Sequence, residues 1–101
     1  MYRSWKRDAN EHLFTELLDR YHIEWLQGKP GDGYDLLVLM QPVEMWEIKN
    51  PDLKPSARKL TESEQKRKEY CRTVGIPYQV LEYTDQAVDV IAAFLRNMEP
   101  K

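Results

Sequence analysis

Residues 33–50 have the sequence GYDLLVLMQPVEMWEIKN, and this stretch decides the fold. Two apolar runs, 36–40 and 43–48, lie on either side of Gln41-Pro42. Runs of this length that are bounded by Gly, Pro and Asn are typical of neighbouring β-strands. The sequence therefore predicts a tight antiparallel hairpin.

Three charged residues, Asp35, Glu47 and Lys49, lie within this hairpin. Because side chains alternate across a strand, Glu47 and Lys49 share one face of the second strand. Carboxylates are ligands that Mg²⁺ prefers, and a nearby ammonium group can position or activate a water molecule beside a phosphate. The pattern therefore indicates a candidate site for Mg²⁺ and a phosphodiester.

The Glu-x-Lys pattern also has a plainer interpretation, because it is common on the solvated face of a sheet. Here, however, apolar residues occupy both faces of the first strand, with Leu36 and Val38 on one face and Leu37 and Leu39 on the other. A sheet that is covered on both sides has no solvated face. Charged groups at its edge then need ionic partners or a metal ion.

The length of the hairpin loop decides whether Asp35 can reach this site. Opposed residues of an antiparallel pair share a face, so a two-residue loop at Gln41-Pro42 would place Asp35 and Glu47 on opposite faces. A loop with an odd number of residues, or a bulge, brings them to the same face. We therefore expect a three- or five-residue loop, or a bulge near Asp35. Otherwise Asp32 would replace Asp35 as a ligand.

The chain has 101 residues and a mass of 12.1 kDa, which fits one domain over residues 1–101. No apolar run is long enough to span a membrane, and the single cysteine, Cys71, permits no internal disulfide, so we expect a cytoplasmic protein. The formal net charge of −2 argues against a general affinity for nucleic acid. Residues 54–72, however, carry seven Lys or Arg against three Glu, and form a local basic region.

The first helix is expected to begin with a capping box formed by Asp8 and Glu11. The apolar residues that follow form one stripe at helical spacing: Leu13, Phe14, Leu17, Leu18 and Tyr21. Glu11 lies at the margin of this stripe. It therefore either faces the sheet or only caps its own helix, and the pattern does not decide between the two.

The remaining elements are expected in this order: a strand over 22–26, the hairpin, a helix that Thr61 and Glu64 cap and that ends at Gly75, a strand over 78–83, and a final helix from Thr84. A strand, helix and strand that follow a hairpin predict an α/β fold with a mixed sheet flanked by helices.

This αβββαβ order, with Asp35 at the start of the second strand and Glu47-Ile48-Lys49 in the third, resembles the restriction-endonuclease-like PD-(D/E)XK nuclease superfamily. Residues 7–11, residues 55–61 and Gln65 resemble the VRR-NUC and Holliday-junction-resolvase-like branch of small nucleases. The likeness covers roughly residues 7–95. One position departs from it, because Tyr34 stands where the family usually has proline before the metal-binding aspartate.

The resemblance implies a restriction-endonuclease-like core and a DNA endonuclease that depends on Mg²⁺ or Mn²⁺, is specific for branched DNA and is of phage origin. It implies that the metal is held by Asp35, Glu47, the Ile48 carbonyl and Glu11. Lys49 would orient the attacking water. Gln65 would fix Lys49 or a phosphate.

The basic loop after the hairpin and the polar face of the second helix are expected to bind DNA, through Lys54, Arg58, Lys59, Lys68 and Arg72, together with Arg7. Two symmetric cuts in a branched DNA need two active sites, so we expect a homodimer, with the last helix and the tryptophans as candidate contact surfaces. Two alternatives stay open. One is an inactive nuclease-fold module that binds nucleic acid or protein, and the other is an interaction domain whose buried charges form ion pairs.

Overall fold

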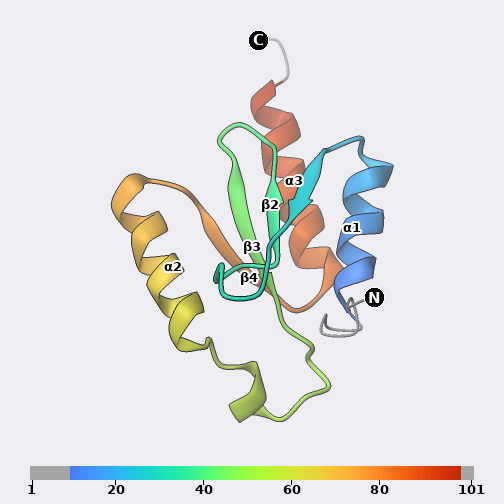
Figure 1. Cartoon of the computed structure of the whole chain (residues 1–101). Helices are drawn as coiled ribbons and strands as arrows, with labels where there is room; N and C mark the ends of the chain where they lie inside the picture. The colour runs from blue at the N-terminus through green and yellow to red at the C-terminus, as the bar shows by residue number, and fades with distance from the viewer. Residues whose placement is uncertain (1–9, 99–101) are drawn as a thin grey trace.

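The computed structural model describes residues 10–98, which form helices and strands (Figure 1). The elements are, in order, α1 (Glu11–Arg20), β1 (Trp25–Gln27), β2 (Leu36–Val38), β3 (Glu44–Ile48), the 3₁₀-helix η2 (Pro55–Arg58), α2 (Glu62–Val74), β4 (Tyr78–Leu81) and α3 (Thr84–Met98). The predicted order of helix, three strands, helix, strand and helix is therefore confirmed.

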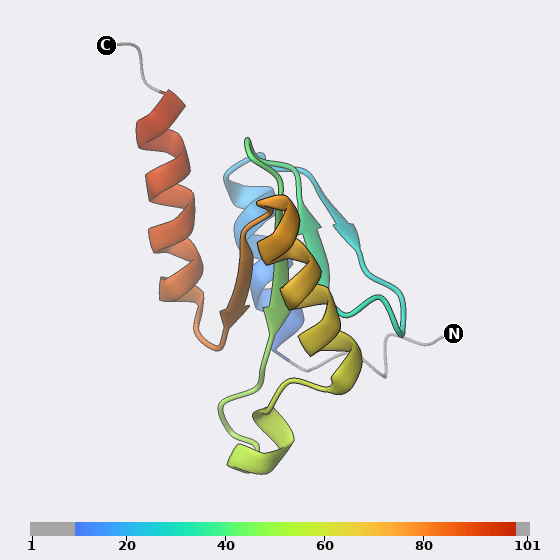
Figure 2. The same cartoon turned by 90° about the vertical axis from the view of Figure 1, so that its left-hand side faces the viewer.

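The four strands form one mixed sheet in the order β1-β2-β3-β4. The first three strands are antiparallel neighbours, whereas β3 and β4 are parallel. Parallel neighbours need a long crossover connection, which η2 and α2 supply. Figures 1 and 2 show α1 and α3 on one face of the sheet and α2 on the other. The predicted mixed sheet with helices on its faces is confirmed.

The main hydrophobic core lies between the sheet and the pair α1 and α3. Trp46 and Phe14 are its largest fully buried side chains. The other members come from the same helices, from the sheet positions on that face and from two connecting segments: Leu17, Leu18, Ile23, Leu36, Val38, Met40, Ile48, Leu81, Ala87 and Ile91. The opposite face, under α2, has a smaller apolar contact, in which the Cys71 thiol lies 3.5 Å from the Met45 sulfur.

The hairpin has the register that brings Asp35 and Glu47 to one face. Leu36 lies opposite Trp46 and Leu37 opposite Met45. Asp35 directly precedes this ladder, and its carboxylate accepts from the Ile48 N–H at 2.7 Å, next to Glu47. The strands are joined by the five residues 39–43, which is one of the predicted loop lengths. The condition under which Asp32 would replace Asp35 therefore does not arise.

The start of the first helix differs from the prediction. The N-cap of α1 is Asn10, whose side chain makes no capping hydrogen bond. Its amide nitrogen donates instead to the Lys49 carbonyl at 3.1 Å and to the Glu82 carbonyl at 2.9 Å. Asp8 lies outside the described residues, and the predicted capping box with Glu11 is wrong, because Glu11 is the first residue of the helix.

The first strand also begins later than predicted, at Trp25. The reason lies in the end of α1, where backbone N–H groups are still bonded to helix carbonyls. The His22 N–H donates to the Asp19 carbonyl at 3.0 Å, and the Ile23 N–H donates to the Leu18 carbonyl at 2.9 Å. These two residues therefore close the helix and cannot pair with a neighbouring strand.

The second helix has the predicted ends. The Thr61 hydroxyl accepts from the Glu64 N–H, and the Glu64 carboxylate accepts from the Thr61 N–H, which is a complete capping box. At the other end, Gly75 has φ of 83° and its N–H donates to the Cys71 carbonyl. A left-handed residue of this kind ends many helices.

The loop 28–34 lies against the first turns of α2 because Gly33 has no side chain. Gly33 has φ of 84°, and a Cβ there would lie 2.5 Å from the Ser63 carbonyl oxygen and 2.7 Å from the Arg67 Cβ. The Arg67 Nε donates to the Asp32 carbonyl at 2.9 Å. This close approach fixes the loop that leads into Asp35.

Gly33→Ala is expected to lower the free energy of unfolding by at least about 2 kcal/mol, since both the positive φ and the adjacent backbone oppose a Cβ. Gly31→Ala is the matched control. Gly31 has φ of 90° but no heavy atom within 4 Å of the added Cβ, so only the conformational cost of about 1 kcal/mol applies. Urea unfolding measures both losses, and equal losses would contradict the close contact between loop and helix.

Candidate active site

Four charged side chains form a cluster on the sheet face that α2 covers: Asp35, Glu47, Lys49 and Glu64. Glu47 and Lys49 are 4% and 8% exposed, which is unusual for charged residues. The Lys49 Nζ lies 2.9 Å from the Glu64 Oε1 and 3.2 Å from the Glu47 Oε2. The predicted pair Glu47 and Lys49 is therefore part of a buried ionic contact between β3 and α2.

Lys49 is held through its backbone as well as its side chain. Its N–H donates to the Leu81 carbonyl at 2.8 Å, and its carbonyl accepts from the Asn10 amide at 3.1 Å. Its ammonium group is fixed by Glu47 and Glu64. Groups from the sheet, from α1 and from α2 thus determine the position of one side chain.

The environment of Glu47 favours its protonated form. Burial is the main cause, and the nearby charges of Asp35 and Glu64 add to it, so that the pKa of Glu47 is raised from 4.5 to about 9. Lys49 opposes this shift, but its ammonium lies closer to Glu64. A carboxyl group that keeps its proton because of burial and neighbouring carboxylates is one that a bound cation would ionise.

Lys49 and Glu64 form the ionised part of the cluster. Burial alone would lower the pKa of Lys49, but hydrogen bonds and attraction to Glu64 and Glu47 outweigh it and raise that pKa above 10.5. Burial alone would raise the pKa of Glu64, but its bonds to the Thr61 N–H and to Lys49 lower it below 4.5. Lys49 therefore carries a positive charge at neutral pH.

The backbone of β3 orients the Asp35 carboxylate. The Ile48 N–H donates to the Asp35 Oδ2 at 2.7 Å, and the Asp35 N–H donates to the Trp46 carbonyl at 2.9 Å. Asp32 has a different role, since its carboxylate accepts from the Lys29 N–H at 2.8 Å and closes the preceding turn. Within residues 10–98, no three His, Cys, Asp or Glu side chains are grouped closely enough to hold a metal ion by themselves.

Glu11 is buried, with 2% of its surface exposed. Its Oε2 accepts from the Gln27 Nε2 at 3.3 Å. Gln27 pairs with Leu36, so its side chain belongs to the sheet face that α1 covers, whereas Glu47 belongs to the opposite face. A role for Glu11 in binding metal stays a prediction.

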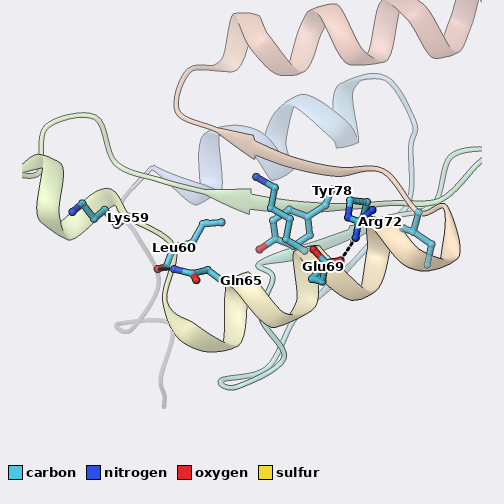
Figure 3. Close-up of a pocket in the computed structure, with 8 residues that line it drawn as sticks. Lys59, Leu60, Gln65, Glu69, Arg72 and Tyr78 are labelled. Atoms are coloured by element: carbon cyan, nitrogen blue, oxygen red, sulfur yellow. Dashed lines mark hydrogen bonds and ion pairs between the residues drawn. The ribbon is translucent and has the colours of Figure 1, made fainter.

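A groove of about 650 Å³ lies between α2 and the sheet. Figure 3 shows Lys59 and Leu60 at one end of it and Arg72 at the other, with Tyr78 between them. Its lining includes the whole predicted polar face of the second helix: Gln65, Lys68, Glu69 and Arg72. Three residues of the predicted DNA-binding set are therefore brought together: Lys59, Lys68 and Arg72.

Only one of the other residues of that set, Lys54, can be placed relative to the groove. Lys54 is exposed in the loop before η2 and does not line it. The side chain of Arg58 and all of Arg7 lie outside the described part of the structure.

Gln65 does not contact Lys49. Its amide nitrogen donates to the Leu60 carbonyl at 3.0 Å, so the position that was expected to fix Lys49 fixes the entry to α2 instead. The neighbouring residue, Glu64, makes the contact with Lys49.

Glu64 and Tyr78 are the two site residues that the sequence did not reveal. Glu64 is accounted for by its capping box, and nothing in the pattern shows that the same oxygen also binds Lys49. Tyr78 pairs with Met45 across the parallel ladder, and its hydroxyl donates to the Gly33 carbonyl at 2.6 Å. Burial and the negative charges of Glu47 and Glu64 raise the pKa of Tyr78.

Comparison with known proteins does not assign the chain to a family: no protein-family model, no curated protein and no solved structure gives a significant match. None of the helices within residues 10–98 is long and apolar enough to cross a membrane.

The raised pKa of Glu47 predicts that stability depends on pH. In EDTA, the native state keeps this proton up to about pH 9, whereas the unfolded chain loses it near 4.5, so the native state binds more protons between these values. The free energy of unfolding should therefore fall as pH rises from about 5 to about 9. Urea unfolding at several pH values measures the slope.

Glu47→Gln should remove this part of the slope, because the amide does not titrate. Glu16→Gln, at an exposed position of α1, is the control and should leave the slope unchanged. A slope that is the same in wild type and in Glu47→Gln would show that Glu47 is ionised in the native state.

Proposed function

We propose that the protein is a metal-dependent DNA endonuclease with a restriction-endonuclease-like core. The observation that carries the proposal is the position of Asp35, whose carboxylate is held by the Ile48 N–H and lies close enough to Glu47 to raise the pKa of that carboxyl group, on the face where Lys49 is buried. Two carboxyl groups and an ammonium group in one cluster are suited to hydrolysis of a phosphodiester once a metal ion is bound. The αβββαβ order of elements supports the same proposal.

Asp35 and Glu47 fit a Mg²⁺ or Mn²⁺ ion. Mg²⁺ is often held by one or two carboxylates, with water and substrate phosphates as the other ligands, so a set of three side chains is not required. The Ile48 N–H orients the Asp35 carboxylate, and the Ile48 carbonyl would be a further ligand. When bound, the ion supplies a Lewis acid for the phosphate and lowers the pKa of a bound water.

Lys49 acts as a fixed positive charge in this proposal. Its raised pKa keeps it protonated, so it does not accept a proton from the attacking water. It holds the water or a phosphate oxygen in place and stabilises the negative charge that develops on the phosphate. Glu64 is a positioning residue, since it fixes the ammonium at 2.9 Å without touching the substrate.

The basic groove supplies a binding surface next to this cluster. Lys59, Lys68 and Arg72 are exposed and can approach DNA phosphates. Specificity for branched DNA and a phage origin belong to the proposal through the family resemblance. A cytoplasmic location rests on the single cysteine, Cys71, which is buried and free.

A second candidate is an inactive nuclease-fold module that binds nucleic acid or a protein. The observation that favours it is the contact of Lys49 with Glu64 and Glu47, which gives the buried ammonium group its partners without a metal. The two candidates differ in whether DNA is cleaved when a divalent metal is added.

The purified protein is expected to cleave branched DNA in Mg²⁺ or Mn²⁺ and to leave it intact in EDTA. Glu47→Ala and Lys49→Met should lower kcat by at least about a hundredfold, since each removes a charge at the reacting phosphate. Lys66→Met is the matched control, because Lys66 is an exposed lysine of α2 outside the groove. A gel assay with branched, duplex and single-stranded DNA measures cleavage. Cleavage in EDTA or full activity of Lys49→Met would contradict the mechanism.

A homodimer stays a prediction. Trp46 is fully buried, so it cannot contact a second copy. The outer positions of α3 are available to contact a second copy, because Leu95 and Met98 are 38% and 65% exposed. Light scattering at tens of micromolar should show twice the monomer mass, and Leu95→Glu should return it to the monomer value.

A further inference from the structure

The groove between α2 and the sheet has an apolar floor and a charged rim. Leu60, Ile76 and Tyr78 are half-buried and form the floor, whereas the charged and amide side chains that line it are exposed. Among the described residues, the rim carries Lys59, Lys68 and Arg72 and one carboxylate, Glu69, which pairs with Arg72. Its volume of about 650 Å³ lies in the range of small-molecule sites, about 300–1,000 Å³.

This combination does not suit the outside of a DNA duplex. A duplex presents its phosphates and sugars outward and keeps the base faces stacked inside, so an apolar floor would face hydrated phosphates. An unpaired nucleotide presents both a phosphate and the flat face of a base. Proteins bind such nucleotides by combining a cationic groove with side chains on which the bases stack.

The groove adjoins the charged cluster. Gln65 in the groove directly follows Glu64 in the cluster. Tyr78 and Val80 point to the same sheet face, and Val80 pairs with Glu47, so Tyr78 lies one side-chain repeat along that face from Glu47. A strand that occupies the groove along Tyr78 therefore passes close to Glu47.

We propose that this groove binds an unpaired nucleotide of a DNA strand, with the base against Leu60, Ile76 and Tyr78 and the flanking phosphates on Lys59, Lys68 and Arg72. The inference rests on the proposed function, because it specifies the kind of strand that the same site receives. The substrate strand is single-stranded where it enters, as at the branch point of a branched DNA.

The test measures binding without cleavage. Fluorescence anisotropy in EDTA compares a labelled thymidine octamer with an abasic octamer that has the same phosphates and no bases. The wild type should bind the thymidine strand about tenfold more tightly, as expected for one stacked base. Equal affinity for the two strands would overturn the proposal.

Two pairs of variants separate the floor from the rim. Leu60→Ala and Ile76→Ala should each reduce the preference for the thymidine strand by a factor of about three, while Val74→Ala should not, because Val74 is 49% exposed and lies outside the groove. Lys68→Ala should weaken binding of both strands equally. It should also reduce the slope of the logarithm of the binding constant against the logarithm of the salt concentration by about 0.7. Lys66→Ala should change neither the affinity nor this slope. Thermal unfolding confirms that each variant is folded. An unchanged preference in both floor variants would overturn the proposal.

The binding test and the cleavage assay can fail independently of each other. If the base preference and its loss in the floor variants are found but no metal-dependent cleavage occurs, the groove assignment stands and the endonuclease proposal fails. If branched DNA is cleaved but the abasic strand binds as tightly as the thymidine strand, the endonuclease proposal stands and the groove assignment fails.

Discussion

The contact of the Lys49 ammonium with the Glu64 carboxylate and the Glu47 carboxyl group is the interaction on which the site depends. Helix α2 connects the two parallel strands, yet Cys71 is its only buried residue among those described. An apolar seam therefore contributes little to its position. The contact at 2.9 Å between Lys49 and Glu64 instead ties the first turn of the helix to the end of β3. The same contact holds the charge that the proposed chemistry requires.

The loop that leads into Asp35 is fixed to the same helix. The Arg67 guanidinium lies 5.9 Å from the Tyr34 ring centre and 5.7 Å from that of Tyr70, and its Nε donates to the Asp32 carbonyl. Cation–π contacts of this kind stabilise by about 0.5–1 kcal/mol at exposed sites. Arg67 is thus occupied in orienting the loop, and its charge belongs to the fold. Helix, loop and hairpin are consequently positioned as one unit around Glu47.

The sequence predicts those features that depend on local pattern. The side-chain alternation of the hairpin is enough to require an odd loop and to place Asp35 beside Glu47, and the capping box and Gly75 are enough to bound α2. It does not predict features that depend on which elements pack together. The second role of Glu64 and the place of Tyr78 in the groove both follow from the parallel pairing of β3 with β4, which no local pattern specifies.

The two faces of the sheet differ in what they contribute. The face under α1 and α3 is apolar and supplies the stability of the fold. The face under α2 holds Glu47 and Lys49 almost fully buried, and Lys49 pairs with Glu64. Burial of polar and charged groups of this kind often stabilises less than apolar residues of the same size would. Apolar residues at these two positions would therefore make the fold at least as stable. The charges are therefore better explained by chemistry at this face than by structure, which is the reason for preferring the enzyme to the inactive module.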